Sequence, residues 1–378
     1  MRANKSVHEY INQKTTTNTY ASNATSNKPN ASNVYGRLAK YFLVAASLSA
    51  VPTTYAYAEK PIAIAIHGGA GTIDKSKMTP QKRAQYDAAL SAAVNKGYEL
   101  LAQGKTSQQA VIAAIQILED SPLFNAGKGA VYTFDETHEL DASIMHGRTL
   151  NAGAVAGVKT VKSPIALAQA IMEKSVHVML SGEGAEQFAK SQNLMMVENS
   201  YFDTEHRYKA LIRAKQKLAK KEQELKDFQA AHHVLDAEYK FGTVGAVALD
   251  KYGDLVAGTS TGGMTAKRYG RVGDAPIIGA GTYANNASCA VSATGHGEYF
   301  IRYHVAADIC ARMQYQGVSL KQASDTVVNK VLVEAGGDGG VIAIDRNGNI
   351  AMPFNSKGMY RASRKHGEQA KVAIFKDE

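Results

Sequence analysis

Threonines next to glycines occur at three points where strands are predicted to begin or end. Gly242 precedes Thr243 at the start of an apolar segment, residues 259–261 (Thr-Ser-Thr) precede two glycines, and Thr294 precedes Gly295. A threonine hydroxyl is a weak nucleophile unless a base lies beside it. Its own α-amino group can be that base, because the usual pKa of such an amine is about 7.7–8.0. Thr243 would gain this amine if the Gly242–Thr243 bond were cut.

Composition alone does not decide between this chemistry and a structural role, because threonine is common in strands. Arg271 and Asp274, three residues apart, could bind a zwitterionic substrate or could form a surface salt bridge. The sequence contains no H-E-x-x-H motif, and Gly295-His296-Gly297 lacks the third glycine of a dinucleotide-binding loop. A zinc hydrolase and a nucleotide-binding enzyme are therefore not favoured.

The bulk composition is that of a globular protein with a substantial core. The 378 residues are 45% hydrophobic and 20% charged, which fits two domains or one large domain. The formal net charge is +9, but residues 1–58 contribute +5 of it, so only +4 remains for the rest of the chain. Outside one charged helix, no basic stripe interleaved with aromatics appears, and we expect no nucleic-acid partner.

The N-terminal region has the three parts of a secretory signal. A polar stretch precedes the basic residues 36–40, an apolar run spans 41–51, and Ala56-Tyr57-Ala58 ends in an A-x-A pattern. We therefore expect residues 1–58 to be a disordered N-terminus plus a signal peptide cleaved after Ala58. The mature protein would be periplasmic or secreted, with no membrane segment. The alternative is a cytoplasmic protein with a disordered tail.

The cysteines Cys289 and Cys310 lack a C-x-x-C arrangement and suitable His spacing, so no zinc site is expected. We expect two buried thiols, and a disulfide remains open if the protein is exported.

Strand and helix patterns alternate through the rest of the chain and predict a layered α+β sandwich. The charged stretch 203–232 is expected to be a solvated, mobile helix or linker. Strands are predicted at 61–66, 130–145, 153–161, 241–250, 255–260, 276–282, 287–294, 340–345 and 350–353, a glycine loop at 67–71, and helices at 79–103, 107–120, 163–174, 297–316 and 319–334.

From His67 to about Arg364 the chain resembles the plant-type L-asparaginase/isoaspartyl peptidase family of N-terminal-nucleophile hydrolases. The order and spacing of the matching segments hold across roughly 300 residues, which makes chance agreement improbable. These segments are residues 66–71 (IHGGAG), 122–129 (PLFNAGKG), 139–145 (ELDASIM), 152–157 (AGAVAG), 242–250 (GTVGAVALD), 259–263 (TSTGG), 270–276 (GRVGDAP), 279–284 (GAGTYA) and 294–298 (TGHGE).

The resemblance implies a four-layer αββα sandwich of the N-terminal-nucleophile type. The precursor would be cut at Gly242–Thr243 into an α subunit, 59–242 with a charged linker at about 203–240, and a β subunit, 243–378. Both would form one domain, and two such pairs would assemble as an (αβ)2 heterotetramer. The implied substrates are asparagine and β-aspartyl dipeptides, and no cofactor is needed for catalysis.

The resemblance also implies a role for each residue of the site. Thr243 would be the nucleophile in self-cleavage and in hydrolysis, and Thr261 would hydrogen-bond its new amino group. The oxyanion would be bound by Thr294 and the Gly295 N–H. The substrate would be held by four residues: Arg271 at its carboxylate, Asp274 and Gly297 at its ammonium group, and Asn125 in the neighbouring loop.

A structural sodium ion is implied as well, held by backbone carbonyls of Leu118, Glu119, Ser121, Phe124, Ala126 and Lys128. Two alternatives remain open: a glycosylasparaginase, and a non-catalytic homologue that is never cleaved.

Overall fold

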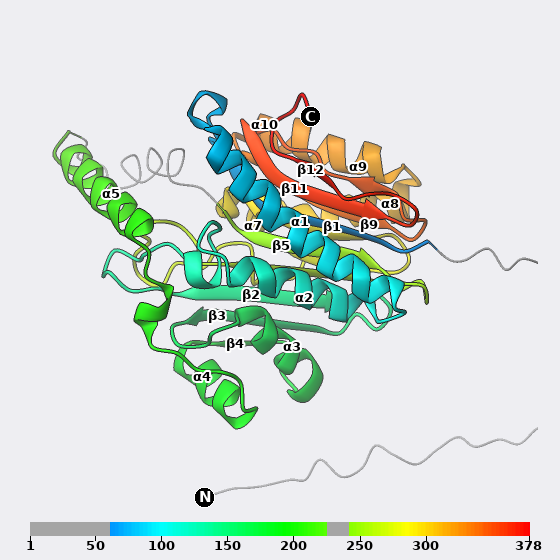
Figure 1. The fold of residues 1–378 in the computed structure, drawn as a ribbon, viewed down its shortest axis with the longest axis horizontal. Coiled ribbons are helices and arrows are strands. Elements are labelled where there is room, and N and C mark those ends of the chain that lie inside the picture. Colours follow the sequence, from blue (N-terminus) through cyan, green and yellow to red (C-terminus); the bar gives the residue numbers. More distant parts are fainter. Residues whose placement is uncertain (1–60, 225–241) are drawn as a thin grey trace, which may run out of the picture. The chain divides into compact units, whose positions relative to one another are not determined.

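Apolar runs rich in alanine and glycine form the centre of a large sheet. Strands β1 (Ala63–Gly71), β5 (Val244–Leu249) and β6 (Leu255–Thr261) are buried along their whole length. Strands of this kind need cover on both faces. In the computed structural model, which describes residues 61–224 and 242–378, they are neighbours in an eight-stranded sheet of order β12-β11-β1-β5-β6-β2-β3-β4 (Figure 1).

The remaining strands of this sheet flank the buried centre. Neighbouring strands are antiparallel, except that β3 and β4 run parallel. The flanking strands are β2 (Leu140–His146), β3 (Ala152–Val158), β4 (Met179–Ser181), β11 (Gly358–Lys365) and β12 (Lys371–Ala373).

A second sheet, of order β10-β9-β8-β7, packs on the first. It consists of β7 (Thr282–Ala284), β8 (Cys289–Gly295), β9 (Gly339–Asp345) and β10 (Ile350–Ala351). Small side chains such as Ala65, Val247 and Ala257 of the large sheet meet Ile342 and Ile344 of β9 in one buried cluster. Small residues let the two sheets approach closely enough to exclude water between them.

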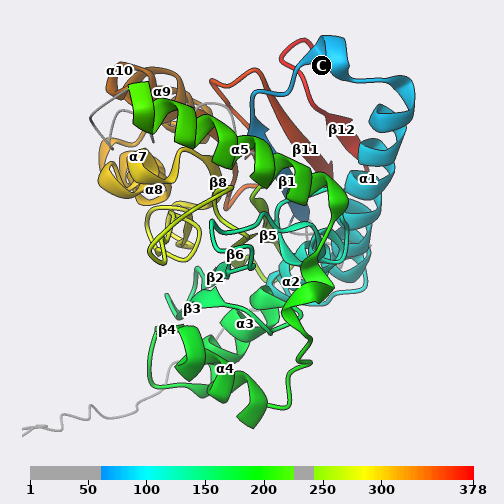
Figure 2. The same cartoon turned by 90° about the vertical axis from the view of Figure 1, so that its left-hand side faces the viewer.

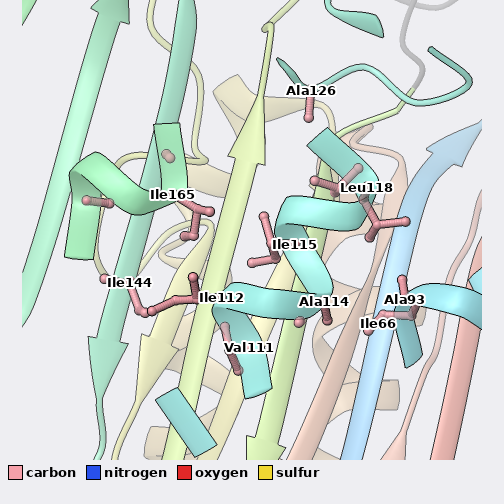
Figure 3. Packing of buried hydrophobic residues seen from close by; sticks show 14 of the residues in the cluster. Ile66, Ala93, Val111, Ile112, Ala114, Ile115, Leu118, Ala126, Ile144 and Ile165 are labelled. Atoms are coloured by element: carbon pink, nitrogen blue, oxygen red, sulfur yellow. The ribbon is translucent and has the colours of Figure 1, made fainter. Parts of the chain in front are cut away.

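Three helices cover the outer face of the large sheet. They are α1 (Pro80–Ala102), α2 (Ser107–Glu119) and α3 (Pro164–Lys174), and α2 lies over the central strands (Figure 1). Thr106 starts α2 with a capping box to Gln109, which satisfies two of the backbone groups left open at a helix start. Figure 3 shows Val111, Ile115 and Leu118 of α2 projecting into the apolar layer beneath it.

Other helices cover the outer face of the small sheet, on the opposite side from α1 and α2 (Figure 2). They are α7 (Gly297–Arg302), α8 (Val305–Gln316), α9 (Leu320–Thr326) and α10 (Leu332–Ala335), with a π-helical turn at Val327–Val331. The layers therefore follow the order helix, sheet, sheet, helix, which confirms the expected four-layer α+β sandwich.

Several predicted elements were wrong in extent. The glycine loop predicted at 67–71 is the end of β1, with a bulge between His67 and Gly69. The single helix predicted at 297–316 is two helices, because His304 adopts a left-handed conformation with φ 47°. Most of the strand predicted at 276–282 is turn, and only Thr282 belongs to β7.

Some elements had no counterpart in the prediction: β4, β11, β12, α4 (Gly182–Ser191) and the short 3-10 helices Lys75–Lys77, Gly127–Gly129 and Asn199–Phe202.

The charged stretch forms helix α5 (Glu205–Glu224), and the part of the predicted linker beyond it lies outside the described residues, as do residues 1–58. The expectation of a solvated helix is wrong for one of its faces. Leu211, Ala214 and Leu218, spaced three and four residues apart, are buried against Tyr132 and Ala266. Across residues 61–224 and 242–378, no helix has the length and apolar character needed to cross a membrane.

The two cysteines form a disulfide that joins Cys289, at the start of β8, to Cys310 in α8. The expectation of two buried thiols is therefore wrong, and the alternative that was left open, a disulfide, is confirmed. The bond closes a loop with a sequence separation of 21. It fastens the helical layer to the strand that ends at Thr294 and Gly295.

We predict that replacing both cysteines by alanine lowers the free energy of unfolding by about 3 kcal/mol, because the unfolded chain is no longer restricted by the closed loop. Thermal unfolding with and without a reductant measures this effect. The wild type should unfold at a lower temperature when reduced, while the double variant should not respond. A wild type that is indifferent to reductant would contradict the prediction.

Candidate active site

One pocket lies where three buried strands begin or end. It lies where β5 begins, at Gly242 and Thr243, and where β6 and β8 end. All of the residues predicted for self-cleavage, catalysis or substrate binding line it: Asn125, Gly242, Thr243, Thr261, Arg271, Asp274, Thr294, Gly295 and Gly297. The structure thus assembles residues that are up to 172 positions apart in the sequence between Asn125 and Gly297.

Thr243 lies directly before β5, and its hydroxyl faces β6. Its Oγ1 donates to Thr261 Oγ1 at 3.0 Å, and the same Thr261 oxygen accepts the Gly263 N–H at 3.0 Å. Two strands paired in register hold this contact, because Val244 pairs with Ser260. The backbone N–H of Gly263 therefore fixes Thr261 as the partner of the Thr243 hydroxyl.

Gly242 has a backbone conformation that favours glycine, with φ 111°. An added Cβ would lie 2.8 Å from both the N and Cβ atoms of Asn125. The Gly242 carbonyl accepts the Asn125 N–H at 3.0 Å. On the other side, a Cβ at Gly69 would lie 2.3 Å from the Gly242 Cα atom. The peptide before Thr243 is therefore enclosed by two backbone segments that tolerate no side chain there.

The Asn125 side chain serves its own loop. Its Nδ2 donates to the Gly263 carbonyl at 2.7 Å, and its Oδ1 accepts the Val131 N–H at 2.9 Å. The backbone N–H of Asn125, and not its amide group, contacts the Gly242 carbonyl. The side chain thus joins the loop of residues 125–131 to Gly263 beside the pocket.

Thr294 and Gly295 end β8 on the opposite wall. Thr294 Oγ1 accepts the Ala70 N–H at 3.2 Å, so its own hydroxyl hydrogen can point into the pocket. A Cβ at Gly295 would lie 2.4 Å from the Asp338 carbonyl oxygen, so the backbone there requires glycine.

A charged cluster forms the far end of the pocket. Arg271 donates to Glu298 twice, from Nε at 2.8 Å and Nη2 at 3.0 Å. Gly297 lies between Arg271 and Asp274, since a Cβ there would be 2.8 Å from Arg271 Nη2 and 2.9 Å from Asp274 Oδ1. The expected Arg271/Asp274 pair is thus in place, and Glu298 is a third member that the sequence did not indicate.

Burial and pairing set the charge of this cluster. Burial raises the pKa of Asp274 to about 7, although the nearby Arg271 opposes the shift. Asp274 Oδ2 is buried and has no hydrogen-bond partner among the described residues. Burial also acts to raise the pKa of Glu298, but the hydrogen bonds from Arg271, the charge of Arg271 and weaker contributions together outweigh it and lower the value to about 2. Near neutral pH the cluster holds an ionised Arg271–Glu298 pair beside a carboxyl that can take or release a proton.

Two buried residues that sequence reasoning missed lie behind Thr243. His67 Nδ1 is 2.9 Å from the Thr243 carbonyl oxygen, and His67 Nε2 is 2.9 Å from Ser292 Oγ. His67 belonged to a matching segment, but its partners are 176 and 225 positions away, so no local pattern pointed to them.

Ser260 has a catalytic sequence pattern but not the matching structure. It stands at the centre of a G-x-S-x-G pattern, residues 258–262. Ser260 is buried within β6, however, and its hydroxyl donates to the buried Glu119 of α2. It is not an exposed nucleophile of the kind that pattern can indicate.

The loop after α2 carries the carbonyls expected to hold sodium. Gly127 and Gly129 let it fold tightly, since added Cβ atoms would lie 2.3 Å from the Glu119 oxygen and 2.1 Å from the Phe124 oxygen. Backbone carbonyls are ligands suited to hard cations. The Ala126 carbonyl accepts the Gly129 N–H at 3.2 Å, which leaves a second lone pair on that oxygen. Among residues 61–224 and 242–378, no three His, Cys, Asp or Glu side chains are grouped as a metal site.

Known proteins match this chain over nearly all of its described part. A sequence profile for the family described as Asparaginase matches residues 60–374. An isoaspartyl peptidase from Escherichia coli is 51% identical over 315 residues, which cover 83% of this chain and 96% of the relative. A plant-type L-asparaginase from Pyrococcus abyssi is 42% identical, covering 81% of this chain and 97% of the relative.

A putative isoaspartyl peptidase/L-asparaginase from Dictyostelium discoideum is 47% identical, covering 80% of this chain and 93% of the relative. With a matching profile and relatives at this level of identity and coverage, the chain belongs to this asparaginase family.

Proposed function

We propose that the protein is an isoaspartyl peptidase and L-asparaginase that cuts itself between Gly242 and Thr243 and then uses Thr243 as its nucleophile. One observation carries the proposal. In one pocket, Thr243 directly follows the tightly enclosed Gly242, and the Arg271/Asp274 pair lines the same pocket. The first feature suits cleavage of the chain, and the second suits a substrate with a free carboxylate and a free ammonium group.

Self-cleavage would begin with attack of Thr243 Oγ1 on the carbonyl carbon of Gly242. The C–N bond to Thr243 breaks, the acyl group moves to the hydroxyl as an ester, and the nitrogen becomes a free amine. Water then hydrolyses the ester and leaves an α subunit ending at Gly242. The Asn125 N–H already donates to the Gly242 carbonyl, so it can stabilise the negative charge that develops on that oxygen.

Turnover repeats this chemistry on the substrate. The freed amine takes the proton of Thr243 Oγ1 as the oxygen attacks the side-chain carbonyl of the substrate. The hydroxyl of Thr294 and the N–H of Gly295 stabilise the oxyanion. One such donor contributes on the order of 3 kcal/mol in other hydrolases. Ammonia or an amino acid leaves, and water hydrolyses the aspartyl ester to release aspartate.

The charged cluster would orient the substrate. The Arg271 guanidinium receives the α-carboxylate, and Asp274 with the Gly297 carbonyl receives the ammonium group. Because a nearby positive charge favours the carboxylate form, the arriving ammonium group lowers the pKa of Asp274 from about 7. A β-linked aspartyl peptide keeps both of these groups free, whereas an α-linked one has lost its α-carboxylate.

An oxidising compartment outside the cytosol suits the folded protein best. A disulfide between Cys289 and Cys310 is stable in oxidising surroundings and rare in the cytosol. We therefore propose that the mature α subunit starts after Ala58, as expected from the signal pattern. Intact mass spectrometry of protein from the native host would reject this if residues 1–58 were still attached.

Two further features are proposals on the family pattern. The carbonyls around 118–128 would hold a structural sodium ion, and unfolding temperatures that are equal in sodium and choline chloride would argue against it. The cleaved chains would assemble as (αβ)2, and a single αβ pair in light scattering would argue against that.

Replacement of Thr243 by alanine should leave the chain uncut, because the attacking oxygen is gone. Intact mass spectrometry should show a single full-length chain for this variant. The wild type should give two fragments, one ending at Gly242 and the other starting at Thr243. The wild type should hydrolyse asparagine and β-aspartyl-leucine faster than N-acetylglucosaminyl-asparagine. Maturation of the alanine variant would overturn the proposal, and the reverse substrate order would favour a glycosylasparaginase.

Replacement of Gly242 by alanine should slow self-cleavage at least about tenfold, because a Cβ meets Asn125 at 2.8 Å and the residue has φ 111°. The time course of chain cleavage on denaturing gels measures this effect. Gly182→Ala is the matched control, since Gly182 also has a positive φ, 52°, but open space around it. Equal slowing of both variants would mean that backbone strain in general, and not the contact with Asn125, is responsible.

Replacement of Arg271 by lysine should raise KM for asparagine by about 10- to 100-fold, because a lysine cannot form two parallel hydrogen bonds to a carboxylate. Self-cleavage should proceed, since that reaction needs no substrate carboxylate. Arg312→Lys is the control, because Arg312 pairs with Asp308 in α8 and does not line the pocket. An unchanged KM would remove Arg271 from substrate binding.

A further inference from the structure

His67 is a buried polar group in contact with Thr243 that the mechanism above does not use. It lies at the bulge of β1, where it pairs with Gly245 of β5, two residues after Thr243. Its ring is fully buried and contacts the Thr243 carbonyl on one side and Ser292 on the other. A buried imidazole with a partner at each nitrogen has a defined orientation.

The partners also define which nitrogen carries the proton. Burial lowers the pKa of His67 to about 3, although the hydrogen bond to Thr243 opposes the shift, so the ring is neutral near pH 7. A carbonyl oxygen only accepts hydrogen bonds, so His67 Nδ1 must carry the hydrogen that binds the Thr243 oxygen. His67 Nε2 is then bare and accepts the hydroxyl hydrogen of Ser292.

A series of buried hydroxyls leads away from Ser292 and is compatible with this tautomer. Ser292 uses its hydrogen on His67, so its oxygen accepts from Thr259 at 2.7 Å. Thr259 in turn accepts from Thr282 at 2.5 Å, and Thr282 accepts from Ser143 at 2.8 Å. The four hydroxyls come from β8, β6, β7 and β2, and each can donate toward His67, while Thr259 and Ser143 also contact the carbonyl oxygens of Gly281 at 3.2 Å and Ala275 at 2.6 Å. The hydroxyls are compatible with this tautomer, and the Thr243 carbonyl determines it.

Gly245 leaves the room that this arrangement needs. A Cβ at that position would lie 2.0 Å from Ser292 Oγ and 2.4 Å from His67 Nε2. Both distances are far below van der Waals contact, so a side chain at Gly245 would separate the two partners. The glycine provides an observation independent of the hydrogen bonds themselves.

We propose that His67 is a positioning residue for Thr243: its Nδ1–H, fixed by the Ser292 hydroxyl, holds the Thr243 carbonyl and so orients the nucleophile. The inference rests on the proposed function of Thr243. In the uncut chain, Gly242 also restrains Thr243. After cleavage Thr243 is a chain end that lies before the first residue of β5. The bond to His67 then restrains rotation of the residue that carries both the amine and Oγ1.

Asparagine and glutamine at position 67 separate positioning from packing. The asparagine Nδ2 group can take the place of Nδ1 and donate to Thr243, whereas glutamine reaches toward Ser292 and leaves the Thr243 carbonyl without its donor. We expect His67→Gln to slow self-cleavage and to lower kcat by about 10- to 100-fold with KM within about threefold, since small misplacement of reacting groups costs rates of this size. His67→Asn should recover at least about tenfold of the lost kcat.

The control is His177→Gln, at an exposed position. Ser292→Ala and Gly245→Ala test the support of His67 itself. His177→Gln should match the wild type, and the other two should lower kcat as His67→Gln does. Equal kcat for the asparagine and glutamine variants at position 67, or a change confined to KM, would overturn the proposal.

Nitrogen-15 NMR of the imidazoles in the uncut Thr243→Ala protein gives a readout that does not depend on how the position-67 variants fold. His67 should carry its hydrogen on Nδ1 only, and a hydrogen on Nε2 would overturn the proposal. If Thr243→Ala matured, the proposed function would fail. If Thr243→Ala stayed uncut but His67→Gln behaved as wild type, only the role of His67 would fail.

Discussion

The site depends on two consecutive backbone carbonyls, that of the Gly242–Thr243 peptide and that of the peptide after it. The Gly242 carbonyl accepts the Asn125 N–H, and the Thr243 carbonyl accepts from His67. With both carbonyls fixed, the Thr243 side chain has few directions available, and its hydroxyl donates to Thr261. Rigid placement of this kind lets a weak nucleophile react, because little orientational entropy remains to be lost at the transition state.

The four-layer fold supplies these contacts from opposite sides. Asn125 follows α2 on the outer helical layer, His67 lies in the large sheet, and Ser292 belongs to the small sheet. Gly245 lets the large sheet approach Ser292 of the small sheet without a side chain between them, and Gly69 lets β1 approach Gly242. A Cβ at either position would come within 2.4 Å of a neighbouring heavy atom. Packing at this density leaves no room for adjustment, so the site and the inter-sheet core are one structure.

Local pattern was sufficient for helices α1, α2 and α3 and for strands β5, β6, β8 and β9, but it predicted a strand from residue 130, whereas β2 begins only at Leu140. The apolar spacing of residues 107–120 predicted α2 almost to the residue. The break at His304 was not predictable, because the left-handed conformation occurs there without a glycine. The buried face of α5 was hidden by its many charges, since three apolar residues on one side are a weak signal.

The pocket residues were predicted from family resemblance, while the partners that hold them were not. Glu298 follows Gly297 directly, yet nothing in the sequence indicates that its carboxylate would meet Arg271. Contacts of this kind depend on how distant strands register and on side-chain direction, and neither has a local signature. The same applies to the disulfide, since two cysteines 21 residues apart are equally compatible with free thiols.

The charged cluster has a further consequence for which molecules can bind. Before substrate arrives, Glu298 neutralises Arg271, and Asp274 has a pKa of about 7. A molecule with only a carboxylate would compete with Glu298 and leave Asp274 without a cation. A molecule with only an ammonium group would leave the Arg271–Glu298 pair intact and gain a single contact. A free amino-acid end would supply both charges at once: its carboxylate would share Arg271 with Glu298, and its ammonium group would give Asp274 the cation it lacks. In the proposed function, recognition of the zwitterion would therefore depend on the electrostatic balance of the whole cluster, and not on Arg271 or Asp274 singly.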